Sequence, residues 1–98
     1  MDRARAMDIL KGSEAELRRR GVLHVALFGS VARGEATPES DVDVMLELDP
    51  AAPISAFDYA AIVHFVQGLF EAPVDVANRD SLKPHVRPNA IRDAIDAF

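Results

Sequence analysis

The stretch that decides the fold is LFGSVARGEATPESDVDVMLELD, Leu27 to Asp49. An apolar run ends at Gly29, a mostly polar segment follows, and a second apolar run opens with two acids, Asp41 and Asp43. From Asp41 to Leu48 the alternate positions are valine and leucine, a pattern typical of a strand with one face toward a core. The stretch therefore predicts two strands joined by a polar loop, with two carboxylates at the start of the second strand.

The flanking residues predict helices and a third strand around this pair. We expect helices over residues 3–11, 14–20, 55–70 and 89–98, and strands over residues 22–28, 41–48 and 74–77. Ser13 and Glu16 have the spacing of a capping box for the second helix. Phe57, Phe65 and Phe70 are expected in the core. The chain therefore reads as one α/β (α+β) domain, residues 1–98, with a small mixed sheet of about three strands.

The composition is typical of a globular protein and excludes several functional classes. Of the 98 residues, 49% are hydrophobic and 28% charged, and none is cysteine, so no disulfide or thiolate metal site is available. No apolar run approaches the roughly 20 residues of a membrane span, and no signal peptide is evident, so we expect a cytoplasmic protein. The net charge of -5 disfavours direct binding of long nucleic acids, which requires neutralised phosphates.

Asp41 and Asp43 are the first candidates for chemistry. Residues two apart on a strand share a face, with Cα atoms roughly 6.5 to 7 Å apart. Two carboxylates that close repel unless a cation lies between them, and Mg²⁺ suits such hard oxygen ligands. Asp75, between Val74 and Val76, would join them if its strand lies alongside. Three carboxylates could then hold two metal ions and support a phosphoryl displacement.

Gly29 and Ser30 supply the second part of the candidate site, a place where an anion could bind. A glycine at a strand end lets the backbone approach a ligand closely, and a helix or turn starting at Ser30 would direct N–H groups and a hydroxyl toward an anion such as a nucleotide phosphate. Arg33 follows in the loop, where it could contact a phosphate or cap the loop. The cluster of residues 18–20, three arginines, is interpreted as a solvated helix end.

The segment GSVARGEATPESDVD, Gly29 to Asp43, resembles the signature of the nucleotidyltransferase superfamily typified by DNA polymerase beta. With a helix before LFGS and a later strand that contains Val-Asp, the chain is most similar to the small bacterial and archaeal branch, the minimal nucleotidyltransferases (MNT). The resemblance covers nearly the whole chain. It implies the polymerase beta-like nucleotidyltransferase fold.

The resemblance also implies roles for individual residues. Gly29 and Ser30 would bind the triphosphate of ATP, Asp41 and Asp43 would ligate Mg²⁺, and Asp75 would complete the metal site and help to deprotonate the acceptor. The implied reaction is attack of a hydroxyl on the α-phosphorus of ATP, which transfers AMP and releases pyrophosphate.

Finally, the resemblance implies a partner. Minimal nucleotidyltransferases are commonly paired with a ribonuclease of the HEPN family, so the expected role is the antitoxin of a type VII-like toxin–antitoxin pair that adenylylates a tyrosine of the HEPN toxin. A small sheet could also leave apolar surface for a homo-oligomer. Two alternatives stay open at this point: an antitoxin that neutralises its HEPN partner by binding alone, and a nucleotidyltransferase that modifies a small molecule.

Overall fold

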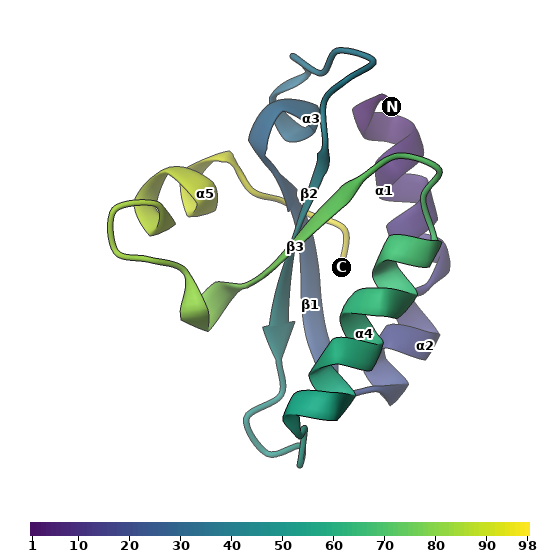
Figure 1. Ribbon diagram of the computed structural model, residues 1–98, viewed down its shortest axis with the longest axis vertical. Coiled ribbons are helices and arrows are strands. Elements are labelled where there is room, and N and C mark those ends of the chain that lie inside the picture. Colours follow the sequence, from purple (N-terminus) through teal and green to yellow (C-terminus); the bar gives the residue numbers. More distant parts are fainter.

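The computed structural model describes all 98 residues as a four-stranded mixed sheet with helices against both faces (Figure 1). In chain order the elements are α1 (Arg3–Gly12), α2 (Glu14–Arg19), β1 (Val22–Phe28), α3 (Gly29–Arg33), β2 (Val42–Leu48), α4 (Ala56–Gly68), β3 (Val74–Asn78), the 3-10 turn η1 (Arg79–Ser81), α5 (Arg87–Asp93) and β4 (Ile95–Asp96). The strand order is β3-β2-β1-β4, and only β2 and β3 run parallel. The predicted α/β fold is confirmed, with one strand more than expected.

The main core lies between the sheet and the helices α1, α2 and α4, which stand together on one side of the strands in Figure 1. Val44 and Leu46 of β2 point into this core, and so do Val25 and Leu27 of β1. Because side chains alternate along a strand, the residues between them face the other side of the sheet. Fifteen buried residues form the main core, whereas only three form the cluster on the other face.

That second face, which we call the open face, is covered only in part. Its buried cluster consists of Ala26 and Met45 from the strands and Ala90 from α5. In Figure 1, α5 stands on the side of the strands away from α1, α2 and α4. The acids predicted on alternate strand positions therefore point to the face that has few covering helices. None of the helices has the length and apolar character needed to cross a membrane.

The C-terminal segment differs from the sequence prediction of one helix over residues 89–98. Helix α5 ends at Asp93, and the chain turns extended at Ala94 (φ -67°, ψ 136°). Ile95 and Asp96 then pair with β1 as the fourth strand. The helical spacing of the apolar residues was misleading because β1 otherwise presents an unpaired edge, and backbone pairing with that edge outweighs local helix preference.

Two details of the helices also differ. Ser13 makes no side-chain capping bond, whereas Ser55 and Asp58 at the start of α4 form a reciprocal capping box. Phe57 is 88% exposed rather than part of the core. It lies five residues before the buried Ile62, which places it roughly 140° around the helix from the buried face. Phe70, by contrast, is buried as expected.

Candidate active site

The site begins where β1 ends. Phe28 has extended backbone geometry, and Gly29 turns the chain with φ of 71° directly into the short helix α3. No side chain caps the first turn of α3. Its leading backbone N–H groups have no intrahelical acceptor. The sequence predicted a turn or helix at Ser30, and the structure has a helix there.

Asp43 lies directly over Gly29. A Cβ atom placed on Gly29 would overlap Oδ2 of Asp43 and lie 3.0 Å from its Cγ. Glycine is therefore favoured at this position for two independent reasons, the left-handed φ and the carboxylate above it. The Gly-Ser segment and the Asp-x-Asp segment, separated in sequence by a loop, meet in space at this contact.

The register of the sheet places Asp75 beside Asp43. β2 and β3 are parallel, and their Cα partners include Asp43 with Asp75. Val74 and Val76 pack against the main core, so Asp75 projects from the open face together with Asp43. On the other side of β2, Asp43 pairs with Phe28 of β1. The condition under which Asp75 was expected to join the other acids, a third strand alongside the second, is therefore met.

Asp41 occupies a different position. It precedes β2 and is exposed, outside the ladder that aligns Asp43 with Asp75. It is nevertheless close enough for its charge to act on Asp43. Of the three predicted acids, two are therefore fixed by strand pairing and one lies at the end of the loop.

Electrostatics at the site is dominated by Asp43. Partial burial raises the pKa of its carboxyl above the usual range, and the negative charges of Asp75 and Asp41 raise this pKa further, while Arg33 opposes the shift. A carboxylate destabilised by its neighbours favours any cation that can share it. The predicted repulsion among the acids is thus present at Asp43.

Arg33 is held by two carboxylates. Its Nε lies 3.1 Å from Glu35 and its Nη1 lies 3.1 Å from Asp93. The hydrogen bonds to Glu35 and Asp93 raise the pKa of the guanidinium. Arg33 therefore ties α3 to α5, and its positive charge acts on Asp43. Its contact with a phosphate stays a prediction. No sequence pattern pointed to Asp93, because an isolated acid 60 residues from its partner has no recognisable spacing.

The residues fit a magnesium ion in chemistry but form no ready-made cage. Carboxylate oxygens are the ligands Mg²⁺ prefers, and Asp43 and Asp75 present them side by side. However, no group of three or more His, Asp or Glu side chains is arranged to hold a metal. The three-carboxylate metal site predicted from the sequence is thus absent as a preformed cluster.

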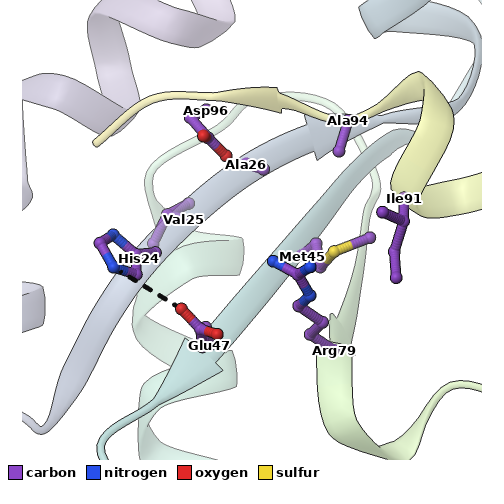
Figure 2. Close-up of a pocket in the computed structure, with 9 residues that line it drawn as sticks. All are labelled: His24, Val25, Ala26, Met45, Glu47, Arg79, Ile91, Ala94 and Asp96. Atoms are coloured by element: carbon purple, nitrogen blue, oxygen red, sulfur yellow. Dashed lines mark ion pairs between the residues drawn. The ribbon is translucent and has the colours of Figure 1, made fainter.

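A hollow of about 230 Å³ lies further along the open face (Figure 2). Its floor is formed by Ala26 and Met45, and His24 and Glu47 face each other at its edge, with Nε2 and Oε2 3.6 Å apart. The histidines were expected to be ordinary surface or partly buried residues. His24 is indeed exposed, and its one ion pair is with the neighbouring strand.

Comparison with known protein families matches residues 10–97 to the nucleotidyltransferase domain. The chain belongs to this family. The nucleotidyltransferase fold was expected from the Gly-Ser and Asp-x-Asp segments, and the match spans both of them together with Asp75. The protein is therefore an enzyme of the nucleotidyltransferase class.

Individual relatives show which branch of the family the chain is similar to. Over 88 residues the nucleotidyltransferase is 31% identical to the protein adenylyltransferase MntA of Thermococcus cleftensis, with 89% of this chain and 87% of that protein covered. A solved structure provisionally described as a minimal nucleotidyltransferase is 33% identical, with a TM-score of 0.71 and 97% and 95% of the two chains covered.

The fold also recurs in a complex. A structure of a tri-AMPylated HEPN toxin of Shewanella oneidensis with its MNT antitoxin matches with a TM-score of 0.63 at 13% identity, covering 94% of this chain and 71% of that one. At this identity the likeness concerns the fold. This nucleotidyltransferase therefore shares the architecture of the minimal branch, as the resemblance implied.

Proposed function

We propose that this nucleotidyltransferase transfers AMP from ATP to a hydroxyl of a protein, and that the acceptor is a tyrosine of a HEPN toxin for which it is the antitoxin. The observation that carries the proposal is the placement of Asp43 between Gly29 and Asp75. Relatives named as protein adenylyltransferases, and a fold shared with an MNT antitoxin bound to an AMPylated toxin, support the protein acceptor.

In the proposed reaction each segment has one task. Gly29 and Ser30 bind the triphosphate through backbone N–H groups and the serine hydroxyl, and Arg33 adds positive charge next to it. Asp75 accepts the proton of the acceptor hydroxyl as its oxygen attacks the α-phosphorus. The bond between the α-phosphorus and the bridging oxygen breaks, and pyrophosphate leaves toward α3. Holding both substrates at Asp43 aligns the attacking and leaving oxygens.

Magnesium is part of this proposal. Asp43 and Asp75, with Asp41 nearby, are the residues that would hold one or two ions together with phosphate oxygens, and a bound ion would neutralise charge on the phosphates. Two carboxylates are sufficient for such a site because Mg²⁺ usually takes its remaining ligands from substrate and water. The raised pKa of Asp43 is the electrostatic reason why an ion is favoured there.

The proposal is tested by incubating the protein with a HEPN-domain protein, Mg²⁺ and ATP labelled at the α-phosphate. We expect label on a tyrosine of the HEPN protein, with Asp43→Asn and Asp75→Asn reducing the rate at least about a hundredfold, in line with the loss of a positioned acid–base group. The matched control is Asp8→Asn, an exposed acid on α1 far along the chain from the site, which should transfer normally.

Binding of the HEPN protein is measured alongside transfer. Both catalytic variants should still bind it, because the substitutions keep the size of the side chain. A wild-type protein that transfers no label, yet neutralises the ribonuclease as fully as the two variants, would establish neutralisation by binding alone. Label on a small molecule but on no protein would instead establish the small-molecule activity.

A further inference from the structure

The hollow on the open face, here the sheet-face hollow, has the lining of a site for a flat ring. Ala26 and Met45 form its floor, and Ile91 and Ala94 line the wall at α5. Arg79 of η1 reaches over the floor beside Met45, and it forms no ion pair with the other residues drawn in Figure 2. A thioether and a free guanidinium both make favourable contacts with aromatic rings.

The sheet-face hollow lies next to the proposed catalytic residues along the strands. Met45 follows Asp43 by two positions on β2, so both side chains point to the open face with Cα atoms roughly 6.5 to 7 Å apart. Arg79 directly follows β3, the strand that carries Asp75. A group lying over Met45 therefore has Asp43 on the side toward the site and Glu47, at the edge of the hollow, on the other side.

A second hollow, of about 250 Å³, lies between α3 and α5. Gly29 and Arg33 line it, together with Phe28 and Asn89. A nucleotide whose triphosphate is held at Gly29 and Arg33 would occupy this second hollow with its phosphates. The sheet-face hollow shares no residue with the second hollow, so we assign it to the other substrate.

We propose that the sheet-face hollow binds the side chain of the acceptor, and that its lining selects a phenol, hence tyrosine, over serine or threonine. The inference rests on the proposed function and identifies where its second substrate lies. A phenol can keep its ring over Met45 while its hydroxyl reaches Asp43 and Asp75. A serine or threonine hydroxyl, one bond beyond Cβ, cannot do so while its backbone stays outside the hollow.

With the acceptor ring in the hollow, each bond formed in the transfer is matched by a bond that breaks. The phenol oxygen forms a bond to the α-phosphorus, its proton passes to Asp75 and then to solvent, and the bond to the pyrophosphate oxygen breaks. The products are the tyrosyl adenylate ester and pyrophosphate. Arg79 takes no part in the transfer of protons; it acts as a positioning residue that holds the ring.

Binding of a small probe tests the inference separately from catalysis. N-acetyl-L-tyrosinamide is titrated into the protein while amide shifts are followed by NMR. We expect shifts at Ala26, Met45 and Ala94 and none comparable with N-acetyl-L-serinamide. Ala94→Phe, which fills the hollow, should weaken tyrosinamide binding at least about tenfold, equal to roughly 1.4 kcal/mol, while the affinity for a non-hydrolysable ATP analogue stays within about twofold.

The control is Ala60→Phe, the same change at an exposed position of α4 behind the sheet, which should alter neither affinity. Arg79→Ala is a second variant that needs no added bulk, and it should raise the KM for the protein acceptor more than it lowers kcat. If Ala94→Phe abolishes binding of the nucleotide analogue instead, the hollow is the nucleoside site and the inference is wrong.

Equal tyrosinamide binding by wild type, Ala94→Phe and Arg79→Ala would also overturn the inference. Failure of the proposed function gives a different result from failure of this inference: the wild-type protein binds the probe in the hollow but transfers no label to any protein.

Discussion

Gly29 is the residue on which the geometry of the site depends most directly. Its φ of 71° and the contact with Asp43 each disfavour a side chain. From the sequence, Gly29 was predicted to let a ligand approach the backbone closely; in the structure the group that approaches is a carboxylate of the protein itself. The sequence identified both residues but held no indication that they touch, because that contact depends on the path of the intervening loop.

We expect Gly29→Ala to lower the free energy of unfolding by about 2–4 kcal/mol, the sum of left-handed strain and overlap with Asp43. Gly34→Ala is a matched control, since Gly34 also has positive φ (75°) but no atom lies within 4 Å of the place where its methyl group would stand. It should cost only about 1–2 kcal/mol. Denaturant titration measures the free energy of unfolding of both variants. Equal losses would show that the overlap with Asp43 does not contribute to the cost of Gly29→Ala.

Asp43 should reveal a conflict between stability and activity. Its raised pKa means that the folded state prefers the protonated carboxyl. Between the unfolded and the folded pKa, the folded protein binds more protons, so the free energy of unfolding falls as pH rises through that interval. We expect Asp43→Asn, which lacks this loss, to be more stable than wild type at pH 7 and to lose that advantage near pH 3.

Thermal unfolding of both proteins across this pH range checks the prediction. Asp8→Asn again serves as the control, because it removes one exposed carboxylate outside the site. An advantage of Asp43→Asn that grows on acidification would contradict the prediction.

At the scale of elements, the strands were easier to predict than the C-terminal segment. β1 coincides with its predicted span, and β2 and β3 each differ by one residue at one end. A short apolar run identified β1, and alternation of apolar and acidic residues identified β2 and β3. For residues 94–98 the apolar spacing also suits a helix, and the choice is made by the free edge of β1, which is a property of the assembled sheet. Phe57 shows the same limit, since its exposure depends on which side of α4 meets the sheet.

The junction of α3 and α5 yields a prediction at this scale. Arg33 and Asp93 link these helices, and Asp93 is 21% exposed while Arg33 is 42% exposed. A double-mutant cycle with Arg33→Ala and Asp93→Ala should give a small favourable coupling free energy, because ion pairs that solvent reaches contribute little. Hydrogen exchange in α5 should quicken in either variant.

Glu35, the other ion-pair partner of Arg33, provides a control for the Asp93 variant. Glu35 is 65% exposed and lies two residues after Arg33, outside α5, so Glu35→Ala should leave exchange in α5 unchanged. If Glu35→Ala loosens α5 as much as Asp93→Ala, the link between the helices is not specific to Asp93.

For the whole molecule, the two faces of the sheet have separate tasks. The face packed by α1, α2 and α4 contains nearly all of the buried apolar side chains, and the open face carries the acids and both hollows. Composition and periodicity were enough to predict the first face. The second was predicted only as a set of candidate residues, since its shape arises from α5, η1 and the Arg33 link, for which the sequence has no repeating pattern.

The parallel pairing of β2 with β3 has a consequence for how such a chain can change length. Deletion of one residue at the start of β3 would shift its register by one position, so that Asp75 would point into the core and a valine would lie beside Asp43. Neighbouring positions of a strand face opposite sides of the sheet. Residues 34–41 are largely exposed and lie between α3 and β2. They belong to no strand, so a change in their number does not move side chains from one face of the sheet to the other. Natural insertions and deletions in descendants of this gene should therefore accumulate in that loop and be absent from β3.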